Sequence, residues 1–212
     1  MRNTDAANTK RQTGIKRRTL VMGAAWSVPT VMLAVGAPAA SASANCTPQA
    51  AATIQANWQF NGNLGTWTTA RTPGTAPVVE YSGTYNGLPA AALVVADPPT
   101  GVASSTTLTS VTACLAPGTY TFTFDARLYN ANPRNLTLTA SVRNVNSPAT
   151  PLATTSFTTT TGAATSRNGN VLTVTVTQRT SVQFVYAWTF TATGTGAGDD
   201  IAVNAPRIAK TA

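Results

Sequence analysis

The sequence contains no histidine, and charged residues make up only 9% of the chain. Histidine is the side chain most often used as a general base near neutral pH and as a ligand of transition metals, so its absence removes many catalytic mechanisms. The Gly-x-Ser-x-Gly turn of serine hydrolases is missing too. A glycosidase needs two carboxylates facing one bond, and nothing in the spacing of the few acidic residues favours such a pair. We therefore expect a protein that is not an enzyme.

The N-terminal segment has the features of an export signal. The pair Arg17 and Arg18 stands just before a 17-residue apolar run, Leu20–Gly36. Small residues follow this run, and Ala42 and Ala44 each end an A-x-A site that a signal peptidase accepts. A basic region, an apolar run and such a site together predict a signal peptide over residues 1–44.

The paired arginines resemble the twin-arginine type of bacterial signal, with the general secretory route as the alternative. A retained membrane anchor is disfavoured, because the apolar run is at the lower length limit of a spanning helix and contains Pro29. We expect cleavage, secretion to the exterior of a bacterial cell, and no membrane contact afterwards.

Removing this segment changes the charge of the chain. Of the 14 basic residues 6 precede residue 45, as does 1 of the 6 acidic residues, so the net charge falls from +8 to +3. The remaining arginines are scattered, and no basic stripe with interleaved aromatic residues is present. We expect no nucleic-acid partner.

Cysteine is scarce: the chain has two, Cys46 and Cys114. An even count in an exported chain favours one disulfide bond, with two buried free thiols as the alternative. Closing a loop of this size stabilises the folded state by about 4 kcal/mol in the chain-entropy model. Without histidine to pair with, neither cysteine is expected to bind a metal or act as a nucleophile.

Residues 45–212 alternate between apolar and polar side chains in several segments, and nothing in them has a convincing helical period. This period of two predicts strands with one buried face. The apolar rows comprise Tyr120, Phe122, Phe124, Ala126 and Leu128; Leu136, Leu138, Ala140 and Val142; Leu172, Val174 and Val176; and Val182, Phe184, Tyr186, Trp188 and Phe190. Turns are predicted at Asn61-Gly62, Asn86-Gly87, Pro117-Gly118, Asn132-Pro133, Ser147-Pro148 and Asn168-Gly169. We expect one all-β domain over 45–212, an antiparallel β-sandwich.

Three segments carry a family resemblance. Residues 57–67 (NWQFNGNLGTW) resemble the opening of jelly-roll carbohydrate-binding modules, and residues 115–127 (LAPGTYTFTFDAR) are similar to their middle strand. Residues 188–192 (WTFTA) followed by 199–203 (DDIAV) resemble their last part. The resemblance spans about residues 54–208 and implies a jelly-roll sandwich that binds a polysaccharide or another component of the cell envelope.

Modules of this kind bind sugars through exposed aromatic rings and nearby polar groups. The outward row of residues 119–129 supplies three candidates, with Asp125 accepting from a diol, Arg127 donating hydrogen bonds and Tyr129 stacking on a sugar ring. Tyr81, Tyr85 and Trp67 lie in loop-like segments that we place at the rim of the sheet, with a position in the core as the alternative for Trp67. The alternative for Asp125 and Arg127 is a surface ion pair.

The resemblance also implies a structural calcium ion, held by an aspartate of the last strand and by an early glutamate. Asp200 matches the first position, but Asn61 stands at the second and supplies a neutral oxygen. Calcium affinity falls as carboxylate ligands are lost, so the ion is an open question.

Two hypotheses for function follow. The first is a non-catalytic module that binds a glycan, which predicts an exposed aromatic row on one sheet. The second is a structural or adhesive surface domain, which predicts a sheet face covered by threonine and without such a row.

Overall fold

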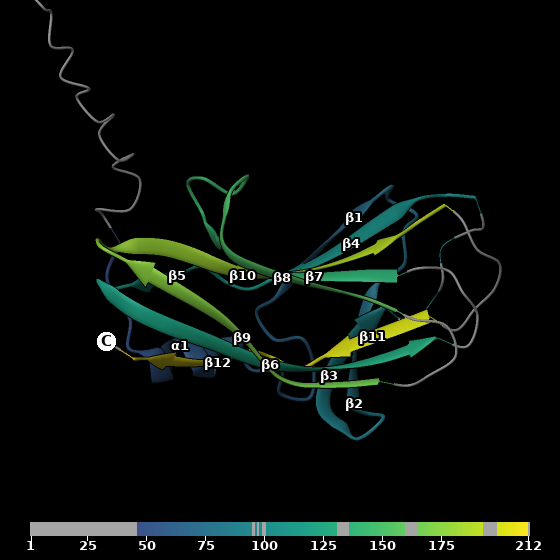
Figure 1. The fold of residues 1–212 in the computed structure, drawn as a ribbon, viewed down its shortest axis with the longest axis horizontal. Helices are drawn as coiled ribbons and strands as arrows, with labels where there is room; N and C mark the ends of the chain where they lie inside the picture. The colour runs from purple at the N-terminus through teal and green to yellow at the C-terminus, as the bar shows by residue number, and fades with distance from the viewer. Residues whose placement is uncertain are drawn as a thin grey trace, which may run out of the picture. The chain divides into compact units, whose positions relative to one another are not determined.

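The alternating segments form the facing surfaces of two antiparallel sheets (Figure 1). The computed structural model describes residues 46–94, 96, 98, 101–130, 136–159, 165–192 and 199–211, all within one compact unit that spans Ala40–Ala212. The predicted signal residues Arg17, Arg18, Ala42 and Ala44 lie outside the described residues. The antiparallel β-sandwich predicted from the sequence is confirmed.

Sheet A contains six strands in the order β1-β4-β10-β7-β8, with β5 paired to β10. Their bounds are β1 Thr68–Thr72, β4 Ser104–Thr109, β5 Ala113–Leu115, β7 Leu136–Asn144, β8 Pro151–Thr158 and β10 Thr180–Phe190.

Sheet B also contains six strands, in the order β12-β6-β11-β3-β2, with β9 paired to β6. Their bounds are β2 Val79–Tyr85, β3 Leu88–Val94, β6 Gly118–Asn130, β9 Thr165–Val176, β11 Asp199–Val203 and β12 Arg207–Lys210. β9 pairs along most of β6, so β11 and β12 share the other edge of β6 and pair with successive parts of it.

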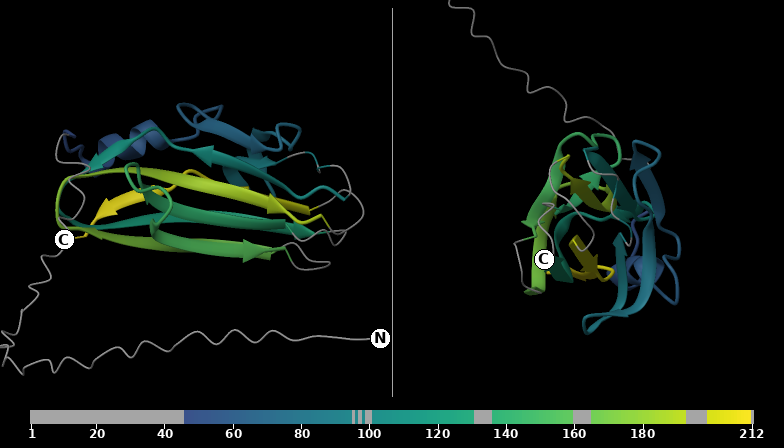
Figure 2. Two further views of the ribbon diagram at one scale, coloured as in Figure 1. Left: turned by 90° about the horizontal axis from the view of Figure 1, so that it is seen from above. Right: turned by 90° about the vertical axis from the view of Figure 1, so that its right-hand side faces the viewer.

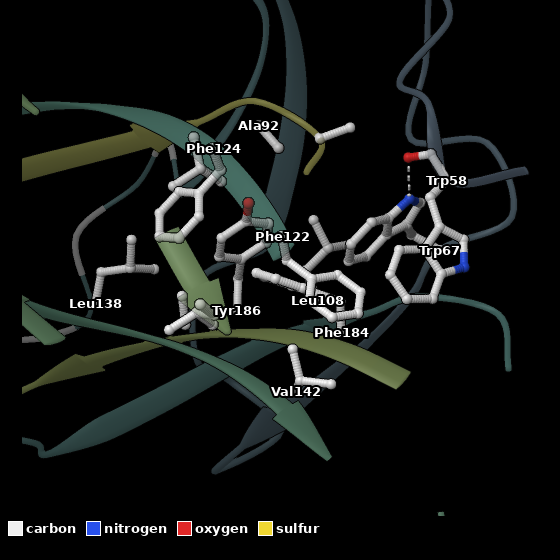
Figure 3. Packing of buried hydrophobic residues seen from close by; sticks show 14 of the residues in the cluster. Trp58, Trp67, Ala92, Leu108, Phe122, Phe124, Leu138, Val142, Phe184 and Tyr186 are labelled. Carbon is white, nitrogen blue, oxygen red and sulfur yellow. Dashed lines mark hydrogen bonds between the residues drawn. The ribbon is translucent and has the colours of Figure 1, made fainter. Parts of the chain in front are cut away.

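The four predicted apolar rows face one another between the sheets and are buried. Aromatic rings gather at the centre, where Phe184 lies 4.9 Å from Tyr186 and 5.9 Å from Phe124 between ring centroids (Figure 3). The end-on view in Figure 2 shows strands of both sheets around this core. Threonine fills many of the outward positions, where a β-branched side chain suits the extended backbone.

A short helix, α1 (Ala51–Trp58), corrects the prediction that residues 45–212 hold no helix. It buries Ile54 and Trp58, four residues apart, against the core. The Trp58 indole N–H donates to the carbonyl of Val111 at 2.9 Å, and the Gln55 Oε1 accepts from the Ile208 amide at 2.7 Å. A helix this short is held by packing, and its single apolar pair is too small a pattern to show a period.

The predicted disulfide bond joins Cys46 to Cys114, with their Cα atoms 5.8 Å apart. It links the residues before α1 to β5, and the Gln49 amide donates to the Cys114 carbonyl at 2.9 Å beside it. Among the residues that the structure describes, no helix has the length and apolar character to cross a bilayer.

The predicted turn at Asn86-Gly87 is confirmed as the tip of the β2–β3 hairpin, with φ of 45° and 77° at its two residues. Turns or bends also occur at Asn61-Gly62, Pro117-Gly118 and Ser147-Pro148, while Asn132-Pro133 lies outside the described residues. The turn predicted at Asn168-Gly169 is wrong. This pair lies inside β9, where the register with β6 shifts between Phe124 and Ala126, because glycine at positive φ also suits a β-bulge.

Candidate functional site

Three residues named from the sequence come together at one end of the outer face of sheet B. Tyr129 of β6 stands opposite Asp200 of β11 in the strand register. The Tyr85 hydroxyl, from the β2–β3 hairpin, donates to Asp200 Oδ2 at 2.7 Å. The side chain of Tyr129 is 37% exposed, one of the few large apolar side chains of the described residues that reach solvent.

The tip of the β2–β3 hairpin lies across this face. Its residue Asn86 accepts a hydrogen bond from Arg127 Nε of β6, with the carbonyl oxygen at 3.2 Å. A small second cluster of buried residues packs the hairpin against the outer face of sheet B. Its members lie on the outer face because they alternate along the strands with residues of the main core. This cluster comprises Leu88, Ala91, Leu93 and Ala202, with Tyr85 packed against it.

A hollow of about 310 Å³ opens beside the hairpin. We call it the Tyr85 hollow, and its lining residues are Glu80, Tyr81, Ser82, Tyr85, Leu93 and Asp200. It therefore combines carboxylates and hydroxyls with one apolar wall, and Tyr129 stands next to it through its pairing with Asp200. An apolar surface with a few convergent polar groups is the usual composition of a small-ligand site.

The Tyr85 hydroxyl keeps its proton in this environment. Burial raises the pKa of Tyr85 well above its ordinary value, and the hydrogen bond to Asp200 and the charge of that carboxylate raise it further. Tyr85 is therefore a hydrogen-bond donor to Asp200 at any pH at which proteins operate. The pair positions the carboxylate.

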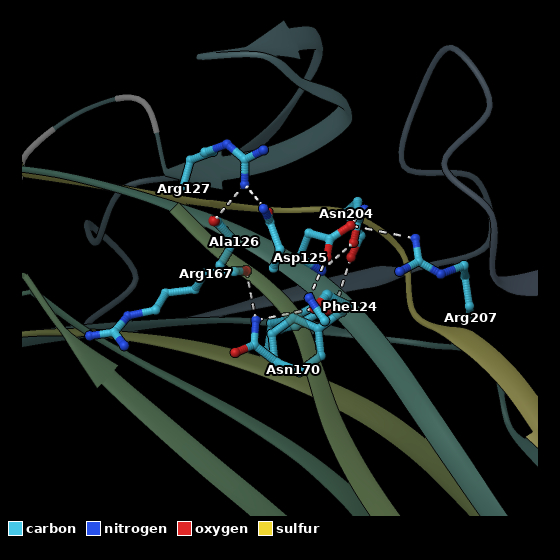
Figure 4. A network of polar contacts seen from close by, with 11 residues as sticks. Phe124, Asp125, Ala126, Arg127, Arg167, Asn170, Asn204 and Arg207 are labelled. Atoms are coloured by element: carbon cyan, nitrogen blue, oxygen red, sulfur yellow. Dashed lines mark hydrogen bonds and ion pairs between the residues drawn. The ribbon is translucent and has the colours of Figure 1, made fainter. Parts of the chain in front are cut away.

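Asp125 and Arg127 share the outward row with Tyr129, as predicted, but their polar atoms serve the fold (Figure 4). Asp125 accepts from the Gly169 amide at 2.7 Å and from Asn204 Nδ2 at 3.2 Å, and it pairs with Arg207 at 3.4 Å. The alternative of an ion pair between Asp125 and Arg127 is wrong, because the carboxylate pairs with Arg207 instead. The expected roles of the two side chains in sugar binding stay a prediction.

Arg127 is engaged on both sides of β6. Its Nη1 donates to Asn168 Oδ1 at 2.7 Å and to the Ala126 carbonyl at 3.0 Å, in addition to the Nε bond to the hairpin tip. It thus ties β9 and the hairpin to β6.

The electrostatics of Asp125 reflect these contacts. Burial alone would raise the pKa of Asp125, but the hydrogen bonds from Gly169 and Asn204 and the charge of Arg207 together lower it below its ordinary value. The carboxylate is therefore stabilised in its ionised form as a structural group.

Trp67 lies in the core, which was the alternative for it, and not at the rim of the sheet. It is only 7% exposed, its ring stacks 6.0 Å from that of Tyr186, and its indole N–H donates to the Trp58 carbonyl at 2.8 Å. The sequence around Trp67 predicts a loop, but in the structure the segment that follows α1 places the ring in the core. Tyr81 is half-buried and packs partly against the core.

The residues expected to hold calcium do not form a site that fits the ion. Asp200 uses one carboxylate oxygen for Tyr85, and Asn61 lies exposed in the turn after α1. Within the described ranges, no group of three or more acidic, cysteine or histidine side chains is placed to hold a metal. Calcium prefers six to eight oxygen ligands, so we assign it no role.

Sequence reasoning missed Glu80 and the hollow itself. Glu80 sits in β2 opposite Leu93, and only the folding of the hairpin over sheet B brings this pair to Asp200. The Asn86-Gly87 turn signalled a hairpin, but nothing in the sequence shows which face a hairpin covers.

The outer face of sheet A has a different character. Three rows of paired residues cross its five main strands, and every position holds threonine, serine, alanine or valine. The rows are Thr68, Thr109, Val185, Ser141 and Thr154; Ala70, Thr107, Ala187, Thr139 and Ser156; and Thr72, Ser105, Thr189, Thr137 and Thr158. These three rows carry no aromatic ring.

No protein-family model matches the chain, and no curated protein is similar to it. Among solved structures it is similar to a family 16 carbohydrate-binding module, with 12% identity and a TM-score of 0.42, over 74% of this chain and 99% of that one. It is also similar to an adhesin domain of Lys-gingipain from Porphyromonas gingivalis W83, with 13% identity and a TM-score of 0.44, over 73% and 96% of the two chains.

A further similar structure is the enzymatically active domain of tailspike protein 4 from bacteriophage CBA120, with 16% identity and a TM-score of 0.42. The match covers 73% of this chain and spans only 20% of the tailspike chain. Several other similar structures are carbohydrate-binding modules, the class that the sequence resembles. These similarities concern the fold, and the function proposed below rests on this chain's own residues.

Proposed function

We propose that this domain binds a glycan without cleaving it, at the Tyr85 hollow and the adjoining ring of Tyr129. The observation that carries the proposal is the position of this exposed ring beside a hollow that contains two carboxylates, Glu80 and Asp200. Aromatic rings bind the apolar face of a sugar, and polar groups next to them fix its hydroxyls.

The chemistry of the hollow suits a hydroxyl-rich, uncharged ligand. Glu80 and Asp200 accept hydrogen bonds from sugar hydroxyls, while Ser82 both donates and accepts. Leu93 supplies an apolar wall. Because the charged residues that line the hollow are both acidic, we expect anionic sugars to be disfavoured there.

We further propose that the domain works outside the cell, after removal of residues 1–44. The disulfide bond supports this, because such bonds persist in oxidising compartments.

The test is a glycan array probed with residues 45–212, followed by affinity measurements on the retained glycan. We expect the Tyr129→Ala variant to bind about tenfold more weakly, which corresponds to about 1.4 kcal/mol and is typical of a binding residue at an interface. Val171→Ala is the matched control, because Val171 is 52% exposed in β9 of the same sheet. Retention of no glycan, or equal binding by Tyr129→Ala, would contradict the proposal.

The absence of catalysis is tested on the same glycan. After prolonged incubation with the domain we expect the oligosaccharide to be recovered intact. New reducing ends that disappear in the Glu80→Gln variant would instead identify a hydrolase.

The second function, a structural or adhesive surface domain, is favoured by the three rows of small, uncharged side chains on the outer face of sheet A. Its prediction is that no glycan is retained and that substitutions on the Tyr129 side have no effect on cell-surface attachment.

A further inference from the structure

A larger hollow of about 480 Å³ lies where sheet B is interrupted between β11 and β12. We call it the α1–β3 notch. Residues from three segments line it: α1 and the residues after it, the start of β3, and the connection from Asn204 to Arg207. None of its residues belongs to the Tyr85 hollow.

The notch exists because two strands leave the sheet at the same place. β3 pairs with β11 at Ala92 and Val203, but Ala90, two residues earlier, has a φ of 48°. On the other side, Asn204 follows the last residue of β11 and bonds to β6, where its Oδ1 accepts from the Asp125 amide at 2.8 Å.

The conformation of Ala90 is costly. A left-handed backbone is strained in a residue that has a Cβ, because the Cβ then comes too close to the following carbonyl oxygen. Ala90 lines the notch itself, and residues held in strained conformations gather at ligand sites. The strained backbone of Ala90 therefore indicates that the notch is a functional site.

A buried amide points to the same place. Gln55 Oε1 is fixed by the Ile208 amide at 2.7 Å, which leaves Nε2 buried and without a hydrogen-bond partner among the described residues. A buried amide N–H without an acceptor destabilises the folded state unless a ligand supplies the acceptor. Gln55 and the exposed Gln59 both line the notch, so the wall offers two side-chain amides to a ligand rich in oxygen.

Arg207 is the one charged residue that lines the notch. Its side chain is 57% exposed, and among the described residues its guanidinium makes a single contact, from Nη1 to Asp125 Oδ2 at 3.4 Å. Asp125 thus positions one side of the planar group, and its other N–H donors remain for a ligand. A guanidinium matches a carboxylate in a two-point hydrogen bond.

The rest of the notch is apolar. Phe60, Pro89 and Ala205 supply carbon surface between the polar groups. Carbon surface of this kind packs against the C–H faces of a sugar ring, and amides form hydrogen bonds with its hydroxyls. A small inorganic anion would make neither contact.

We propose that the notch binds a uronic acid residue of a polysaccharide, with the sugar carboxylate on Arg207. The amides of Gln55 and Gln59 bind ring hydroxyls. This site is separate from the glycan site at the Tyr85 hollow, where the acidic lining disfavours the same sugar. The proposal does not depend on binding there.

The experiment is calorimetric titration of residues 45–212 with a galacturonate trisaccharide and with its methyl ester, which has the same ring without the charge. We expect the acid to bind at least tenfold more tightly than the ester. Arg207→Gln should abolish this preference, and Gln59→Ala should weaken binding of both ligands. Arg167→Gln is the matched control for loss of one positive charge, because Arg167 is exposed on β9 and does not line the notch.

Folding is monitored for each variant by its thermal midpoint, because Arg207 also contacts Asp125. Arg207→Lys keeps the charge and loses the planar fork, so a folded Arg207→Lys protein should show reduced preference for the acid. Equal affinities for acid and ester, an unchanged preference in Arg207→Gln, or equally effective competition by acetate would each overturn the proposal.

The proposals for the two sites can be refuted independently. Tyr129→Ala should leave galacturonate binding unchanged. An array glycan lost in Tyr129→Ala, with no uronate bound, would leave the Tyr85 hollow as the only binding site and refute the notch. Uronate bound at Arg207, with no other glycan retained, would support the notch and refute glycan binding at the Tyr85 hollow.

Discussion

At the residue scale, the position of Asp125 could be predicted from the sequence, but its contacts within the fold could not. Alternation placed it on the outer face of β6, and it is there. Its partners come from β9, from the β11–β12 connection and from Arg207, which are far from it in the sequence. Only tertiary structure shows that these contacts use the carboxylate, whereas Tyr129 stays exposed because nothing packs over it.

The same carboxylate predicts a dependence of stability on pH. Its pKa is lowered on folding, so its contribution is present above the pKa of the unfolded chain, near 3.8, and is lost as the pH falls through the folded value. We expect Asp125→Asn to lower the thermal midpoint at pH 7 and to differ less from the wild type at about pH 2–3. A difference of the same size at both pH values would show that ionisation of Asp125 is not the cause.

Substitutions of core residues are predicted to have larger effects on stability. Trp58 is fully buried, with its ring 6.1 Å from that of Phe122 and its N–H on the Val111 carbonyl. We expect Trp58→Ala to lower the free energy of unfolding by about 3–5 kcal/mol in chemical denaturation. Leu152→Ala, at a side chain 39% exposed in β8, should change it by less than about 0.5 kcal/mol. Similar effects of the two substitutions would argue against the core described here.

At the scale of elements, long strands could be predicted and short or irregular elements could not. β6 and β10 repeat a period of two over 13 and 11 residues, which is a strong signal. α1 has one apolar pair in 8 residues, and its position depends on the tertiary contacts of Trp58. The bulge in β9 and the fold of the β2–β3 hairpin over sheet B also depend on distant partners, which is why both hollows escaped prediction.

The bulge in β9 gives a prediction at this scale. Gly169 has a φ of 66° and has no neighbour within 4 Å of where a Cβ would lie, so any penalty of substitution there comes from the backbone. We expect Gly169→Ala to destabilise the protein by about 1 kcal/mol, read from denaturant midpoints. Gly83→Ala in β2, which also has open space and no positive φ, is the control and should not destabilise by as much. Equal effects would show that the left-handed conformation of Gly169 is not required.

At the scale of the whole molecule, the described part of the chain is a sandwich whose two outer faces differ. Sheet A presents three rows of small, uncharged side chains, and sheet B presents the hairpin with the Tyr85 hollow and the α1–β3 notch. The acidic lining of the first and the arginine of the second suit different sugars.

The disulfide bond acts at the same scale. It closes a loop between residues 68 positions apart, for which the chain-entropy model gives about 4 kcal/mol. We expect a Cys46→Ala and Cys114→Ala double variant to lose stability of this order in chemical denaturation, with no change in glycan affinity. The wild type under reducing conditions should behave like the variant. A loss below about 1 kcal/mol would contradict a stabilising role of this size.

The most direct test of the central claim is a nuclear magnetic resonance titration of ¹⁵N-labelled residues 45–212 with a glycan retained on the array. Binding at the Tyr85 hollow predicts the largest amide shifts at Glu80, Tyr85, Tyr129 and Asp200, with the outer face of sheet A unchanged. Shifts confined to the threonine rows of sheet A, or none at saturating glycan, would contradict the account.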